Sequence, residues 1–66
     1  MKRVTVERRK LGWSQAELAR HAEVNATSMS RIESGKEPAW PKRGKRIADA
    51  LGWQGDPDEL FEDIED

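Results

Sequence analysis

The side chains best able to do chemistry in this sequence are basic, and most of them gather in three clusters. These are Lys2 and Arg3; Arg8, Arg9 and Lys10; and Lys42, Arg43, Lys45 and Arg46. Such clusters can bind a phosphate backbone, because each cation that neutralises a phosphate releases a condensed counterion. The sequence has no cysteine, and His21 is its sole imidazole. Small helical domains also often carry solvated charged faces, so the clusters alone leave nucleic-acid binding open. We expect no cofactor and no metal site and, because the short chain has no set of acid, base and nucleophile, not an enzyme.

The charges are distributed unevenly, although the formal net charge of the 66-residue chain is only −1. Residues 1–55 hold all 12 lysines and arginines with six acidic residues, whereas residues 56–66 hold seven acidic residues and no base. We divide the chain into a basic body (1–55) of formal charge +6 and an acidic C-terminal helix or tail (56–66), both within one small domain. Since it has no apolar run near 18 residues and no cysteine, we expect a cytoplasmic protein without a membrane segment.

Helix start and stop signals predict about five short helices, and therefore an all-α compact bundle. A first helix covers residues 4–11. A second begins at Ser14, which forms a capping box with Glu17. Asn25 is a good N-cap for a third helix, which Gly35 ends as a left-handed residue.

The last third of the chain predicts two more helices. Pro41 has the fixed φ suited to the first turn of a fourth helix that reaches Leu51. An interior Gly44 costs roughly 1 kcal/mol against alanine, so either this helix begins after Pro41 or Trp40 needs close backbone approach there. A short fifth helix follows the N-cap Asp56, and its buried face consists of Leu60, Phe61 and Ile64.

The second and third helices, joined by the three-residue turn 22–24, predict a helix-turn-helix. The second helix of such a unit can enter the major groove of DNA, which is roughly 12 Å wide. Apolar or small residues occupy the positions where the helices must touch: Leu18, Ala19, Ala22, Val24, Met29 and Ile32. The outward positions of the third helix are polar or small: Asn25, Ala26, Thr27, Ser30, Arg31 and Ser34. The third helix is therefore the expected reading surface.

Two segments carry a more specific pattern, since residues 12–19 read GWSQAELA and residues 30–36 read SRIESGK. In these segments the chain resembles the Xre-type family, the phage lambda-type repressor and Cro helix-turn-helix domains. The likeness continues through 47–52 and 58–61 and covers nearly the whole chain. It implies a five-helix DNA-binding domain and a transcriptional regulator, a repressor of phage, mobile-element or bacterial-promoter type. It also implies binding to double-stranded DNA, usually as a dimer on a palindromic operator.

The resemblance further implies roles for single residues. Those that would face base edges in the major groove are Ala26, Thr27, Ser30 and Arg31. Those that would contact the DNA backbone are Gln15, Asn25, Lys36, Lys42 and Arg43. Arg31 is the strongest base-reading residue, because its planar fork can bond O6 and N7 of guanine with about 1–3 kcal/mol of discrimination. The other three offer less, so we expect a substantial part of the specificity to come from DNA shape.

The sequence departs from the family pattern at three places. Glu23 stands where the turn usually has glycine, and it pays about 1 kcal/mol if its φ is positive. The fourth helix has Pro41, Gly44 and Lys45 in place of aliphatic residues, so Trp13 and Trp40 are expected to fill that space. Two extra residues precede Asp58 and lengthen the last connection. We interpret the three tryptophans as packing residues and His21 as structural.

A second class of function stays open, namely an Xre-like protein-interaction module, such as an antitoxin or adaptor, with secondary or no DNA binding. Glu23 and the acidic tail keep this alternative open. The tail is a solvated outer face of a helix, unless it shapes dimer contacts, repels DNA or docks a basic protein partner. We expect a weak homodimer through the fourth and fifth helices, although a monomer also fits the sequence.

Overall fold

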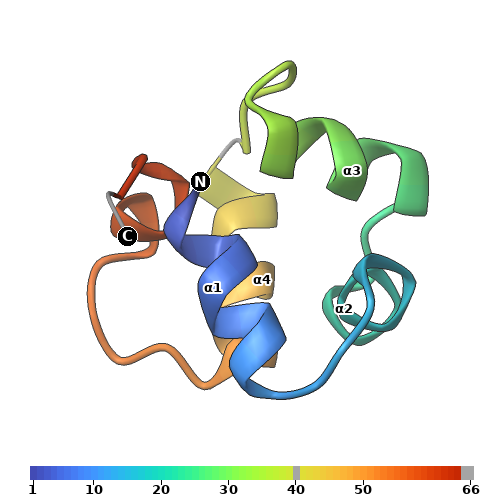
Figure 1. Cartoon of the computed structure of the whole chain (residues 1–66), viewed down its shortest axis with the longest axis horizontal. Helices are drawn as coiled ribbons and strands as arrows, with labels where there is room; N and C mark the ends of the chain where they lie inside the picture. Colours follow the sequence, from blue (N-terminus) through green and yellow to red (C-terminus); the bar gives the residue numbers. More distant parts are fainter. Residues whose placement is uncertain (40, 65–66) are drawn as a thin grey trace.

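The computed structural model describes residues 1–39 and 41–64, which form short helices packed around one core (Figure 1). Its α-helices are α1 (Arg3–Lys10), α2 (Gln15–Ala22), α3 (Ala26–Ser34) and α4 (Pro41–Leu51), and a 3₁₀ helix follows, η1 (Pro57–Phe61). Helix α2 packs on α3 and α4, while η1 packs on α4 and α1. In the described part of the chain, no helix is long and apolar enough to cross a bilayer.

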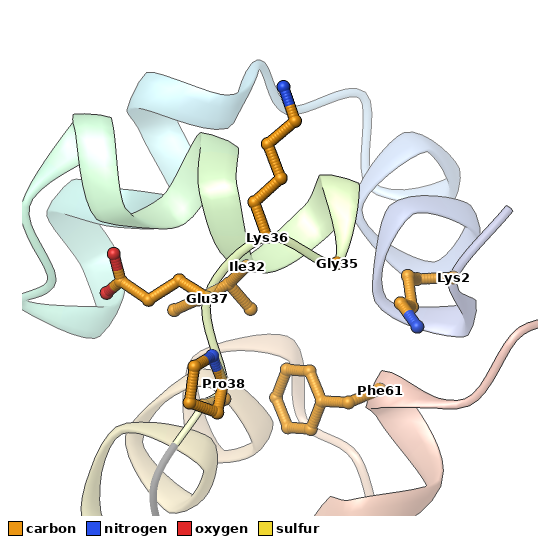
Figure 2. A pocket seen from close by; sticks show the side chains of 8 residues that line it. Lys2, Ile32, Gly35, Lys36, Glu37, Pro38 and Phe61 are labelled. Carbon is orange, nitrogen blue, oxygen red and sulfur yellow. The ribbon is translucent and has the colours of Figure 1, made fainter.

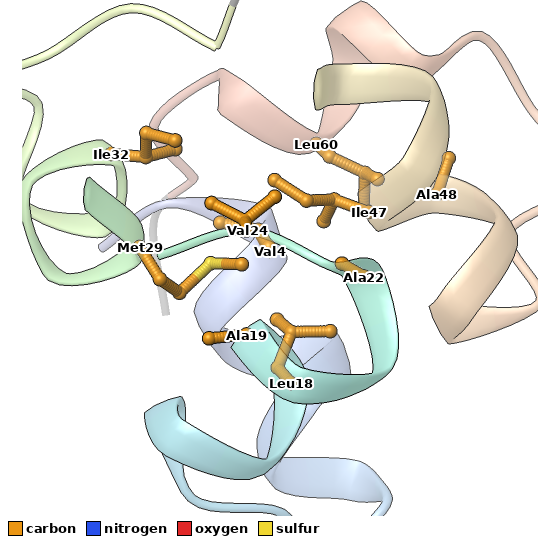
Figure 3. Close-up of a cluster of buried hydrophobic side chains, with 10 residues drawn as sticks. All are labelled: Val4, Leu18, Ala19, Ala22, Val24, Met29, Ile32, Ile47, Ala48 and Leu60. Atoms are coloured by element: carbon orange, nitrogen blue, oxygen red, sulfur yellow. The ribbon is translucent and has the colours of Figure 1, made fainter. Parts of the chain in front are cut away.

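The core is built from one inward stripe of each helix (Figure 3). Among the described residues, those buried in it are Val4, Leu18, Ala19, Ala22, Val24, Met29, Ile32, Ile47, Ala48 and Leu60. Small alanines in α2 and α4 let these helices approach each other, and the longer aliphatic side chains fill the space between α1, α3 and η1. The predicted contact positions of the second and third helices are all buried in this core.

The predicted fifth helix is wrong in type, because the chain forms the short 3₁₀ helix η1 and not a fifth α-helix. The carboxylate of Asp56 accepts the Asp58 N–H at 2.9 Å, and Pro57 occupies the first position. Leu60 is fully buried, as predicted, and Phe61 is half-buried. The helix ends after five residues because the backbone that follows is extended and pairs with the start of the chain.

This pairing, which we call the terminal bridge, joins residues 62–64 to residues 1–3. The Arg3 N–H donates to Glu62 O (3.1 Å), the Ile64 N–H donates to Met1 O (2.9 Å), and Lys2 bridges Asp63 in antiparallel fashion. The prediction that Ile64 lies on a helix is therefore wrong. Helix α1 has no side-chain N-cap and no acidic residue in its first turn. The terminal bridge supplies an acceptor and nearby carboxylates at this helix end.

We expect deletion of residues 62–66 to lower the free energy of unfolding by about 1–3 kcal/mol, because two buttressing backbone hydrogen bonds are lost. Urea denaturation of the full chain and the truncated chain measures this difference. Asp63→Asn is the matched control, since it removes only the exposed ion pair to Lys2, in which the Asp63 side chain is 74% exposed. This variant should cost less than about 1 kcal/mol. Equal stability of the truncated and full chains would contradict a stabilising terminal bridge.

Gly44 is buried in a helix that begins at Pro41, so the predicted later start is not observed. A Cβ at Gly44 would lie 3.3 Å from Cε2 of Phe61. The missing side chain at this position therefore lets the Phe61 ring pack directly on α4. Trp40, the other expected cause, lies outside the described residues.

The two described tryptophans pack against the edge of the core, as expected. The Trp13 ring stacks on His21, with centroids 4.3 Å apart and planes at 10°. The guanidinium of Arg3 lies 5.7 Å from the centroid of the Trp53 ring, and the indole N–H of Trp53 donates to the Asp56 carbonyl at 3.1 Å. Both tryptophans are therefore committed to contacts within the chain.

Candidate nucleic-acid interface

The predicted caps of α2 and α3 are present, and each satisfies backbone N–H groups at the start of its helix. Ser14 Oγ accepts the Glu17 N–H at 3.1 Å, and the Glu17 carboxylate accepts the Ser14 N–H at 2.9 Å. That second hydrogen bond holds the pKa of Glu17 below its ordinary value. In the turn, Glu23 has a left-handed φ of 56°, and Val24 is buried. Asn25 then caps α3, since its Oδ1 accepts the Thr27 N–H at 2.8 Å.

Helix α3 has a buried face and an exposed face, and it lies along the edge of the bundle (Figure 1). Met29, Ile32 and Glu33 are buried. The residues predicted to point outward are exposed: Asn25, Ala26, Thr27, Ser30, Arg31 and Ser34. Gly35 ends the helix with φ 79°, as predicted. The four residues expected to face bases therefore form one accessible surface, presented by a helix whose two ends are both fixed.

Arg31 is exposed, and its guanidinium has no ion-pair partner among residues 1–39 and 41–64. Its backbone is well held, because its carbonyl accepts the Lys36 N–H at 2.9 Å and the Ser34 hydroxyl at 3.1 Å. A pair with Glu33, which would have competed with base contact, does not form because that carboxylate points into the protein. The guanidinium of Arg31 is thus available to donate hydrogen bonds to an acceptor on another molecule.

Glu33 is the centre of a buried polar network that joins three helices. Its carboxylate accepts four hydrogen bonds: from Thr5 Oγ1 (2.8 Å), Arg8 Nε (2.9 Å), Arg8 Nη2 (3.1 Å) and Gln15 Nε2 (3.2 Å). The Arg8 and Glu33 side chains are only 10% and 4% exposed. Arg8 also donates to the Trp13 carbonyl at 2.7 Å. The network locks α1 and the start of α2 to α3, the helix with the exposed polar face.

The sequence analysis missed this network, although a signal for it is present. Arg8 follows the buried Val4 by four residues, and Glu33 follows the buried Met29 by four. Residues four apart share one helix face, so opposite charges stand at inward positions of two helices. Grouping Arg8 with its neighbours as a surface cluster was therefore wrong. Adjacent residues on a helix differ by about 100° in direction, so Arg9 is exposed while Arg8 is buried.

Gln15 lies at the start of α2 and is half-buried. Because an ionised carboxylate only accepts hydrogen bonds, the NH₂ group of Gln15 faces Glu33. Its second amide N–H and its amide oxygen have no hydrogen-bond partner among residues 1–39 and 41–64. The role of Gln15 as a backbone contact stays a prediction, but its side chain is positioned by the buried network rather than free to rotate.

The loop after α3 and the start of α4 hold the other predicted backbone contacts. Lys36 and Lys42 are exposed. Arg43 is engaged within the chain: its Nη1 donates to Glu37 Oε2 at 2.7 Å, and its Nη2 donates to the Pro38 carbonyl at 2.7 Å. These three basic residues follow the C-terminal end of α3 in the chain, and they differ in how exposed and how engaged their charges are.

The predicted basic clusters are smaller in the structure than in the sequence. Lys2 pairs with Asp63 at 3.4 Å, Arg3 covers Trp53, and Lys10 pairs with Glu7 at 3.1 Å. Most of the basic side chains in the first two clusters therefore contact other groups of the same chain. Exposed cations with no ion pair among the described residues stand mainly on the other helices: Arg9, Arg20, Arg31, Lys36, Lys42 and Arg46.

Comparison with known families gives one match. A family model described as a helix-turn-helix domain matches residues 3–61 of the chain. No curated protein and no solved structure matches the sequence.

Proposed function

We propose that this chain, which belongs to the helix-turn-helix domain family, binds double-stranded DNA in a sequence-specific manner and regulates transcription. In this proposal α3 enters the major groove, with Ala26, Thr27, Ser30 and Arg31 toward base edges. The residues that contact the flanking phosphates in this proposal are Gln15, Asn25, Lys36, Lys42 and Arg43. The family match and the exposed face of α3 support this assignment.

The observation that carries the proposal is the contrast between the two faces of α3. Its inner face is fixed by the core and by the four hydrogen bonds to Glu33. Its outer face presents short polar side chains and the unpaired fork of Arg31, within the described part of the chain. Short side chains let a helix backbone approach base edges closely. Because the inner face of α3 is held rigidly by the protein, the helix keeps a fixed position relative to those edges.

The finer assignment follows the sequence pattern. We propose a regulator of the Xre type, a repressor from a phage, a mobile element or a bacterial promoter system. A palindromic operator and a weak dimer through α4 and η1 are part of this proposal. Each copy would place one α3 in the major groove of a half-site.

Selection of bound duplexes from a randomised DNA pool, at about physiological salt, tests the proposal. An enriched palindrome with half-sites about 10 bp apart, centre to centre, would support a two-fold dimer. One enriched half-site would support sequence-specific binding by a single copy and contradict the dimer. A pool without any enriched sequence would contradict the proposed function and favour the alternative of a protein-interaction module.

We expect Lys42→Gln to weaken binding to all duplexes alike and to reduce the slope of log K against log salt by about 0.9, because one phosphate contact is lost. Fluorescence anisotropy titrations at several salt concentrations measure this slope. Lys45→Gln is the matched control, since Lys45 lies on the same helix and its charge is paired with Asp49 at 3.5 Å. An equal loss of slope in both variants would contradict a specific phosphate contact by Lys42.

A further inference from the structure

We propose that Glu37 is a specificity-determining residue of this interface, because its carboxylate competes with DNA phosphates for Arg43. The inference rests on the proposed DNA-binding function and adds to it a residue that limits binding to non-operator DNA. Nothing in the sequence pattern assigns a role to Glu37.

The contacts of Arg43 are short and directional. Its Nη1 donates to Glu37 Oε2 at 2.7 Å and its Nη2 to the Pro38 carbonyl at 2.7 Å. The Arg43 and Glu37 side chains are 20% and 27% exposed, so solvent reaches the pair only in part. These contacts use two of the five N–H donors of the guanidinium. Arg43 is therefore held against the α3–α4 loop with its charge neutralised.

Glu37 is tied to the end of the reading helix as well as to α4. Its backbone N–H donates to the carbonyl of Arg31 at 3.3 Å. Figure 2 shows its side chain pointing away from Phe61, and in a different direction from Lys36. The hydrogen bond from Arg43 lowers the pKa of Glu37, and the charge of Arg31 lowers it further. The carboxylate is thus within electrostatic reach of the predicted base-reading arginine and of a predicted backbone contact.

The chemistry of the pair sets the consequence for DNA. A phosphate oxygen and a carboxylate oxygen accept the same N–H bonds from arginine. On arbitrary DNA, breaking the pair with Glu37 offsets the gain from a new phosphate contact, and the freed carboxylate repels the phosphates. On an operator the other contacts hold a phosphate close to Arg43, so its effective concentration there is high. Glu37 therefore penalises arbitrary DNA more than the operator.

The test is Glu37→Gln, which keeps the shape and one acceptor oxygen but removes the charge. We expect binding to a random-sequence duplex at about 0.1 M salt to tighten about five- to tenfold, because one more phosphate contact becomes available. The salt slope should steepen by about one, and the ratio of operator affinity to random-duplex affinity should fall. Glu7→Gln is the matched control: it makes the same change in net charge and frees Lys10 from a 3.1 Å pair on α1.

An Arg43→Gln background separates release of Arg43 from simple loss of a negative charge. In that background, Glu37→Gln should tighten binding by less than it does in the wild-type background, because no arginine is left to release and only the repulsion between the carboxylate and the phosphates is removed. The inference is overturned by equal gains for Glu37→Gln and Glu7→Gln, by an equal gain in both backgrounds, or by weaker binding of Glu37→Gln. If the wild type binds DNA and Glu37→Gln binds it with the same affinity, this inference is overturned while the proposed function stands. If the wild type and its variants bind no duplex even at low salt, the proposed function fails as well.

Discussion

Replacing Arg8 with methionine is expected to lower the free energy of unfolding by about 3–5 kcal/mol, because Glu33 would stay buried without its counter-charge. Arg8 donates two hydrogen bonds to this carboxylate and a third to the Trp13 carbonyl. Domains this small have few kilocalories of net stability, so the variant should be largely unfolded at room temperature. Urea denaturation followed by circular dichroism at about 25 °C measures the loss.

Two further variants make this result specific to the buried pair. Arg9→Met removes an adjacent, exposed arginine and should change stability by less than about 0.5 kcal/mol. The double variant Arg8→Met with Glu33→Leu removes both charges and should recover most of the loss, because an apolar pair of similar volume can replace a buried ion pair. If Arg8→Met cost no more than Arg9→Met, the network would not be what holds α3 to α1.

The same double variant also separates folding from the positioning of Gln15. Once leucine replaces Glu33, the Gln15 amide loses its only acceptor among the described residues. The chain would fold, but the start of α2 would present a mobile side chain to the DNA backbone. The buried network therefore has two effects, on stability and on the geometry of one predicted backbone contact.

The elements governed by local chemistry could be predicted from the sequence. Ser14 and Glu17 cap α2 reciprocally, Asn25 caps α3, and Gly35 ends it in a left-handed conformation. Each of these interactions lies within one turn of the helix end, so residue type and spacing determine it. The outward face of α3 could be predicted in the same way, because its apolar residues, spaced three apart, mark the inward side.

The interactions that the sequence did not predict join segments far apart in the chain. Glu33 binds Arg8 across 25 positions, and the Ile64 N–H reaches the carbonyl of Met1. Spacing within one helix shows which face a charge occupies, but not which helix stands opposite. The short 3₁₀ helix η1 also results from a contact between distant segments. The residues that would continue a longer helix are extended and pair with the start of the chain in the terminal bridge.

We expect Arg31→Ala to remove the preference for one base pair in each half-site, with the largest loss of specificity among the α3 substitutions. A bidentate contact from arginine to guanine discriminates by about 1–3 kcal/mol, roughly 5- to 150-fold in affinity. The structure favours this outcome because the Arg31 side chain is exposed and unpaired in the described part of the chain, while its backbone is fixed by the C-cap of α3. Repeating the selection from randomised DNA with the variant measures the change in the motif.

Two controls distinguish base reading by Arg31 from its charge. Arg20→Ala removes an exposed arginine from α2 and should weaken binding, if at all, without changing the selected motif. Arg31→Lys keeps the charge but loses the planar fork, so affinity for random DNA should persist while the base preference is lost. A selected motif that is the same for wild type and Arg31→Ala would mean that no base is read by this side chain. In that case α3 would position the chain on DNA, and the specificity would come from the shape of the duplex that its short side chains can fit.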